Sequence, residues 1–161
     1  MKRFISTAVT AIALMGSLST QAFAQTKPSA ITTFLDRLGM NYEVQKDGSI
    51  LILAGVDGNR TQNGFIVPDI GKIGNNDVIA VMSFSRISKT PPDEEKIKQL
   101  QTRVNDISSG WDTVSKEGIY STFYYKIIPL NKDPNLARKD IIEILNIADT
   151  AEKELDSKDT L

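Results

Sequence analysis

Three consecutive acids, Asp93, Glu94 and Glu95, could in principle perform acid–base chemistry. Paired carboxylates hydrolyse glycosidic bonds when one of them keeps its proton through a raised pKa. These acids directly follow two prolines, however, and negative charge also stabilises the first turn of a helix. A glycosidase would need an aromatic-walled cleft as well, whereas aromatic residues make up 7% of the chain. We therefore interpret the three acids as the start of a helix.

The segment Asp57-Gly58-Asn59 resembles the beginning of a calcium-binding loop. Such a loop requires glycine at its sixth position and a bidentate acid at its twelfth. Here those positions are Gln62 and Pro68, so the pattern is more typical of an ordinary turn. We predict no metal site.

The chain contains neither histidine nor cysteine. Ser-His-Asp triads, thiolate nucleophiles and disulfides are therefore excluded. The sequence also contains no Ser-x-x-Lys, no Gly-x-Ser-x-Gly and no glycine-rich phosphate-binding motif. We predict no catalytic residue, no cofactor and no enzyme activity. A carboxylate-based enzyme of the cell envelope, or a small-ligand-binding protein, is the alternative.

Three aromatic residues, Trp111, Tyr120 and Tyr124, form our candidate interaction surface. In the strand expected after Gly118, alternation places Tyr120 and Tyr124 on one face and Phe123 and Tyr125 on the other. One face must be core, and the other would present an amphipathic patch suited to protein binding or self-association. The alternative is that a helix buries one face and ordinary cross-strand pairing uses the other.

The N-terminal segment has the pattern of an export signal. Lys2 and Arg3 precede an uncharged, mostly apolar stretch over residues 4–18, and Ala22 and Ala24 provide the small residues of a cleavage site. A membrane-spanning helix would need about 20 apolar residues. We predict a signal peptide over residues 1–24, cleaved after Ala24. The product would be periplasmic or secreted and, because no cysteine can carry a lipid, would have no stable membrane anchor.

Charge and length indicate one soluble domain that does not bind nucleic acid. The net charge of −1 becomes −3 when Lys2 and Arg3 leave with the signal, whereas nucleic-acid binding requires an excess of cations. Residues 25–155 are long enough for a single core without disulfides. Residues 156–161 are predicted to be a polar tail.

The periodicity of apolar residues indicates the order helix, four strands, helix, two strands, helix. The first helix follows Ser29, the second runs from Thr90 towards Gly110, and the third begins at Asp133-Pro134. Hairpin-like turns connect the strands, and residues 71–77 are expected to be a loop. These features predict an α+β domain, with a mostly antiparallel sheet of about five to six strands and helices on one face.

Each of the three predicted helices has a stripe of apolar residues that we expect to be buried. In the first two helices they are Ile31, Phe34, Leu35 and Leu38, then Ile97, Leu100, Val104 and Ile107. In the last helix, Leu136, Ile141, Ile144, Leu145, Ala148 and Leu155 are expected inside, and Arg138, Lys139, Glu143, Glu152 and Lys153 outside.

Segments along the mature chain resemble the YbjN-domain family of bacteria, which is described as sensory-transduction-regulator-like and has a fold similar to type III secretion chaperones. The matching segments are residues 35–42 (LDRLGMNY) with 47–50 (DGSI), residues 100–105 with Gly110-Trp111, residues 124–130 (YYKIIPL) and residues 141–149 (IIEILNIAD). The export signal and the loop around residues 71–77 depart from the family pattern. The resemblance implies a non-enzymatic module that binds a protein or peptide and that could form a homodimer.

Overall fold

The computed structural model describes residues 29–56, 60–67 and 70–155. Several sequence predictions therefore lie outside the described residues. They are the signal peptide with Ala22 and Ala24, the turn at Asp57-Gly58-Asn59, the strand end at Pro68, and the tail at residues 156–161.

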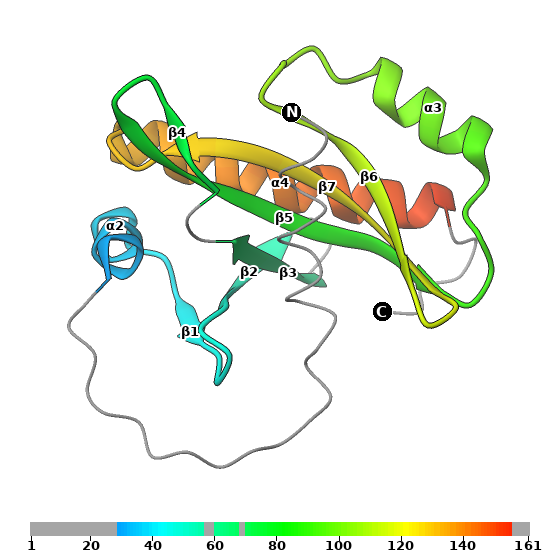
Figure 1. Cartoon of the computed structure of the whole chain (residues 1–161), viewed down its shortest axis with the longest axis horizontal. Helices are drawn as coiled ribbons and strands as arrows, with labels where there is room; N and C mark the ends of the chain where they lie inside the picture. Colours follow the sequence, from blue (N-terminus) through cyan, green and yellow to red (C-terminus); the bar gives the residue numbers. More distant parts are fainter. Residues whose placement is uncertain (1–28, 57–59, 68–69, 156–161) are drawn as a thin grey trace.

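Three helices and seven strands make up the described part of the chain (Figure 1). In chain order they are α2 (Ala30–Leu38), β1 (Tyr42–Val44), β2 (Ile50–Val56), β3 (Arg60–Val67), β4 (Lys72–Ile73), β5 (Asn76–Ser88), α3 (Glu94–Thr102), β6 (Ser109–Lys116), β7 (Ile119–Pro129) and α4 (Pro134–Leu155). Among these helices, none is long and apolar enough to cross a membrane.

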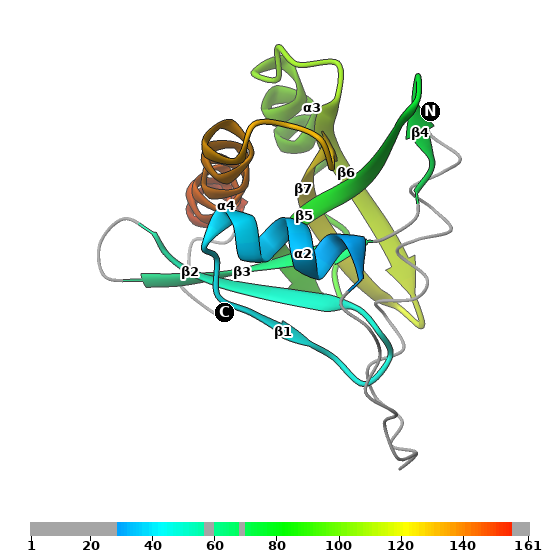
Figure 2. The ribbon, with the colours of Figure 1, turned by 90° about the vertical axis from the view of Figure 1, so that its left-hand side faces the viewer.

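The strands form one antiparallel sheet in the order β1-β2-β3-β5-β7-β6, and the short β4 pairs with β5. The predicted α+β class is confirmed. The strand count is higher than expected because the supposed loop over residues 71–77 contains β4, which folds back on the start of β5 as a small hairpin. Figure 2 shows α2 and α4 on the same side of the sheet.

Helix α2 forms where its local signals predict it. The Ser29 side chain accepts a hydrogen bond from the Thr32 amide, and Gly39 ends the helix in the left-handed region with φ 61°. The predicted stripe of Ile31, Phe34, Leu35 and Leu38 is buried, which confirms it.

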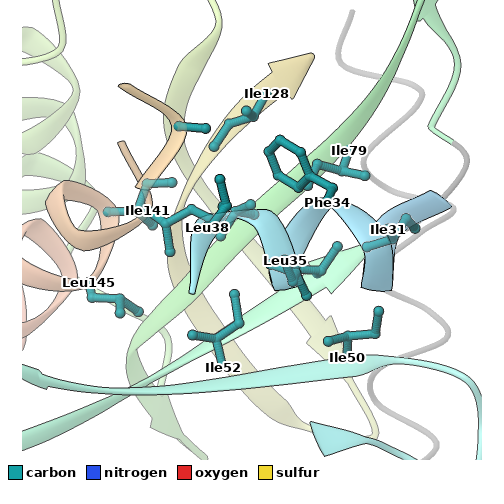
Figure 3. Close-up of a cluster of buried hydrophobic side chains, with 14 of the residues drawn as sticks. Ile31, Phe34, Leu35, Leu38, Ile50, Ile52, Ile79, Ile128, Ile141 and Leu145 are labelled. Carbon is teal, nitrogen blue, oxygen red and sulfur yellow. The ribbon is translucent and has the colours of Figure 1, made fainter. Parts of the chain in front are cut away.

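The main core lies between the sheet and the helices α2 and α4. Figure 3 shows side chains from both helices and from β2, β5 and β7 pointing into this cluster. Phe34, Ile52, Ile141 and Leu145 are each at most 1% exposed. Helix α2 precedes all the strands in the sequence and α4 follows them. Both helices contribute side chains to this core, so it is complete only when both are in place.

Helix α3 ends much earlier than predicted. It stops at Thr102, its N-cap is Asp93 rather than Thr90, and Ile107 is 92% exposed. Residues 106–108 form a turn instead of a helix, because the Asp106 carboxylate accepts hydrogen bonds from the amide and hydroxyl of Ser108. Gly110, the predicted stop, instead belongs to β6.

Helix α4 matches its predicted apolar side except at two positions. Leu136 was expected inside but is 56% exposed, and Glu152 was expected outside but is buried. Glu152 and Asp149 face Arg60 of β3, with Arg60–Asp149 and Arg60–Glu152 distances of 3.1 and 3.3 Å. Because Arg60 is their ionic partner, Asp149 and Glu152 are buried although they are charged, and Arg60 is distant from both in the sequence.

The second face of the sheet carries its own apolar cluster, which consists of Val67, Ala80, Met82 and Phe123 with Phe65, Ile70, Phe84, Val114 and Tyr125 packed against them. Four of these rings form what we call the aromatic row: Phe65, Phe84, Phe123 and Tyr125. Successive ring centroids are 5.4, 5.7 and 6.5 Å apart. No residue of the described helices belongs to this cluster.

Candidate functional site

The structure brings two of the three candidate aromatic residues together. Trp111 on β6 lies opposite Tyr124 on β7, and their ring centroids are 5.2 Å apart. Tyr124 is 6% exposed, and its hydroxyl donates a hydrogen bond to Ser109 Oγ at 2.9 Å. Tyr124 thus faces the main core, whereas Trp111 is half-buried at its margin.

Tyr120 lies apart from this pair. It is opposite Ser115, four residue pairs along the β6–β7 ladder from the Trp111–Tyr124 pair, and is half-buried. It lines a hollow of about 1120 Å³ between α3 and the outer strands, which Trp111 also lines. The three residues therefore do not form one patch, and their role as an interaction surface stays a prediction.

Trp111 and Tyr124 line a groove between α3 and α4, which we call the helix groove. Its volume is about 700 Å³, in the range typical of ligand sites. The apolar lining consists of Leu100, Val104, Trp111, Tyr124, Ile142, Ile147 and Ala151. The charged lining consists of Arg103, Lys126 and Lys139 with Asp106, Glu143 and Glu154, so cations and anions are balanced.

Helix α3 forms one wall of the helix groove and is attached by few contacts. Leu100 is its one buried residue. Gln101 Oε1 accepts a hydrogen bond from the Trp111 amide at 2.9 Å, and Arg103 pairs with Glu154 of α4 at 2.8 Å. Polar contacts near its C-terminal end thus place α3 over Trp111, where a small displacement would change the width of the groove.

Lys126 of β7 forms the end of the helix groove and is surrounded by acids. Its Nζ lies 3.0 Å from Asp140, 3.2 Å from Asp106 and 3.8 Å from Glu143. Burial alone would lower the pKa of Lys126, but hydrogen bonds to Asp140 and Asp106 outweigh it and raise the pKa. Lys126 is therefore a fixed cation that joins β7, α4 and the loop after α3.

The Asp106 carboxylate orders that loop. Hydrogen bonds from the side chain and amide of Ser108, followed by the contribution of Lys126, lower its pKa to about 2. The pKa of Asp47, in the β1–β2 turn, is also lowered, chiefly by the Ser49 hydroxyl. Both carboxyls are ionised at neutral pH, as structural acids are. A general acid would instead need a raised pKa.

We expect the Asp106 turn to make stability depend on acidic pH. The folded pKa of about 2 lies below the ordinary value of 3.8, so the contribution is complete above about pH 4 and is lost as pH falls towards 2. Ser108→Ala should reduce this loss when urea unfolding is compared at about pH 5 and pH 2.5. Because the Asp106 side chain is 43% exposed, we expect a change below about 1 kcal/mol.

Ser115→Ala, at an exposed serine of β6, is the matched control and should leave the pH dependence unchanged. An identical acid dependence in Ser108→Ala and the unmodified protein would contradict this role for Ser108.

Sequence reasoning did not identify Lys126, Asp140 and Asp106 as a set. They come from β7, α4 and a loop, and only the fold brings them together. The one available signal was a lysine in an otherwise uncharged strand, which indicates an ionic partner nearby. Within the described ranges, no group of three or more acids is placed so that it could hold a metal ion.

Comparisons with known proteins find little similarity. No family model matches the chain, and no curated protein matches it. Among solved structures, YbjN from E. coli, described as a candidate transcription regulator, is similar at a TM-score of 0.42 and 11% sequence identity. The match covers 80% of this chain and 94% of YbjN. A similarity at this level carries no argument about function, and the family resemblance stays a prediction.

Proposed function

We propose that this chain is an exported, non-enzymatic module that binds a protein or peptide segment in the helix groove. The observation that carries the proposal is the groove itself, which has an apolar floor beside the Trp111–Tyr124 pair and a charged rim. Apolar anchors seated in such a groove supply most of the binding energy of a segment, and rim charges select its flanking residues.

The balanced rim indicates the chemistry of the partner. Three cations and three anions surround the groove, and two of these pairs already contact each other through Arg103–Glu154 and Lys126–Asp106. A strongly acidic or basic partner would gain little from them. We infer a segment with large apolar residues and mixed polar flanks, presented either as a helix or as an extended chain.

Selection from a displayed library of random peptides, using the purified protein, tests this proposal. Enriched peptides should contain large apolar residues and should change the emission of Trp111, the one tryptophan in the sequence. Ile142→Glu places a charge on the groove wall and should weaken binding about tenfold or more.

Leu136→Glu is the matched control, since Leu136 lies on the same helix, is 56% exposed and does not line the groove. Peptide affinity should be unchanged in this variant. Failure to enrich any peptide, or equal affinity of both variants, would contradict the proposal. Export is tested separately by the mass of the protein recovered outside the cytoplasm, which should begin at Gln25.

A further inference from the structure

The outer edge of the sheet borders a hollow. Among the described strands, β6 is the last in the sheet order and pairs with β7 alone, so its other side has no strand beside it. The hollow of about 1120 Å³ between α3 and the outer strands is lined by every residue from Trp111 to Ser115. Because successive residues of a strand point to opposite faces of the sheet, such a run can line one hollow only along the edge of the strand. We call this hollow the edge slot.

Helix α3 forms the facing wall of the edge slot and runs beside β6 in Figure 1. Its lining residues have the spacing i, i+3, i+4, i+7, which is one stripe along a helix: Glu94, Ile97, Lys98 and Gln101. Leu100 lines the helix groove instead, from a different side of α3. A helix stripe and a strand edge that face each other across a hollow leave room for one extended segment between them.

The backbone of β6 directs alternate amides into the edge slot. In an antiparallel ladder, residue pairs alternate between those that exchange hydrogen bonds and those whose N–H and C=O groups point outward. The Trp111 amide donates to Gln101 Oε1 of α3 at 2.9 Å, so Trp111 is of the outward kind. By alternation, Thr113 and Ser115 are also of that kind, and the Thr113 amide indeed donates to Asp112 Oδ1 at 2.8 Å.

Two side chains accept the hydrogen bonds that a neighbouring strand would accept with its carbonyl groups. The Gln101 amide does so at Trp111, and the Asp112 carboxylate does so at Thr113. When a carbonyl oxygen of a bound segment replaces either side chain, one hydrogen bond is exchanged for another, so the net cost is small. The outward amides of β6 are therefore available to a further strand.

We propose that the edge slot binds an extended segment of a partner protein, which pairs with β6 as an additional strand. Main-chain hydrogen bonds to residues 111, 113 and 115 supply the affinity, and alternate side chains of the segment supply the selectivity. Two carboxylates, Asp112 and Glu94, line the slot against one lysine, Lys98. Opposite charges attract across neighbouring strands, so the segment carries Arg or Lys across from Asp112 and β-branched or aromatic residues beside Trp111.

A single segment fits the edge slot better than a second copy of the chain does. In a second copy, α3 borders the same strand edge, so two copies that pair through β6 would bring both helices into the space between the strands. A segment that is not flanked by a helix enters without that obstruction.

Strand pairing at β6 does not rest on binding in the helix groove. The two hollows lie on different sides of α3, and Trp111 lines both of them. The emission of Trp111 therefore responds to a ligand at either site, and the test uses substitutions elsewhere.

A displayed library of peptides in which β-branched residues alternate with random ones is the probe, and it is selected on the unmodified protein. Proline has no amide hydrogen, and an edge strand tolerates it where that hydrogen would point away from the sheet. Ser115→Pro should therefore keep the β6–β7 ladder and raise the dissociation constant of strand-pairing peptides about tenfold or more. Ile142→Glu, in the helix groove, should leave that constant unchanged.

Two further variants control for the proline. Ser115→Ala removes the hydroxyl but keeps the amide, so it should bind these peptides as the unmodified protein does. Val44→Pro is the matched substitution at the opposite edge of the sheet, in β1. The Gln45 amide donates to the Ser49 carbonyl, so by alternation the Val44 amide points away from β2, and Val44→Pro should leave peptide affinity unchanged.

Methylation of the peptide backbone keeps the test decisive if Ser115→Pro does not fold. A strand pairs through one of its two edges, and the amides of each edge belong to every second residue. Methylating the nitrogens of one edge should weaken binding to the unmodified protein about tenfold or more, whereas methylating those of the other edge should change it less than about twofold.

Equal effects of the two methylation patterns would overturn the proposal. So would selection that yields no peptide sensitive to Ser115→Pro in a folded variant, or one that yields only peptides sensitive to Ile142→Glu. Self-association of the unmodified protein that Ser115→Pro abolishes would make a second copy the occupant and would equally overturn it.

Discussion

Phe34→Ala should lower the free energy of unfolding by about 3–5 kcal/mol, the usual cost of removing a buried phenylalanine ring. The Phe34 ring is 1% exposed and lies in the cluster between α2, α4 and the sheet. Its loss leaves a cavity there and also removes the stacking of Arg37 over its ring at 5.8 Å. Urea unfolding followed by far-ultraviolet circular dichroism measures the change.

Domains of this size have free energies of unfolding of about 5–15 kcal/mol, so the loss expected for Phe34→Ala is a large share of that stability. Leu136→Ala is the control, because Leu136 is equally apolar but 56% exposed, and it should change stability by about 0.5 kcal/mol or less. Similar losses in the two variants would show that α2 does not close the core.

Lys126→Met is the second substitution with a large expected effect. It leaves Asp106, Asp140 and Glu143 near one another without the cation that neutralises them, and only Asp140 keeps another lysine, Lys132. The Lys126 and Asp140 side chains are 15% and 12% exposed, so water would stabilise the carboxylates only weakly after the lysine is removed. We expect a loss of about 2–3 kcal/mol, because breaking a buried ion pair leaves charges uncompensated.

Lys72→Met provides the comparison for that loss. Lys72 and Asp77 form an ion pair at 3.2 Å, but both side chains are more than 60% exposed. Such surface pairs contribute about 0–1 kcal/mol. The expected difference between the two lysines comes from the burial of Lys126 and from its three acidic neighbours, and equal losses would refute the structural role of Lys126.

The sequence predicted correctly those helices and strands whose boundaries are set by residues close to them in the sequence. The helix at α2 is one example, since its cap, its stripe and its terminal glycine all lie within eleven residues of Ser29. β7 is another, because alternation and two flanking turns give Ile119–Pro129 its observed bounds. The order of elements followed, apart from β4, which is a two-residue strand in a glycine-containing segment.

Predictions failed where a tertiary or side-chain contact decides the outcome. Helix periodicity continues past Thr102 to Ile107, but the hydrogen bonds of Asp106 with Ser108 hold residues 106–108 in a turn. Glu152 looks like a solvated residue until Arg60, 92 positions earlier, is placed beside it. The helix groove could not be predicted for the same reason, since its walls are two helices separated by β6 and β7.

The pairing of the first helix with the last one has a consequence for the order of folding. Ile52, Ile66 and Ile79 are buried against α4, and α2 packs on α4 as well. During synthesis, the sheet would therefore emerge with this apolar face uncovered until α4 follows. Because α4 spans Pro134–Leu155, a nascent chain cannot complete this core until α4 has been synthesised. For the export that we propose, a chain whose core is still open would be able to pass through a narrow translocation channel.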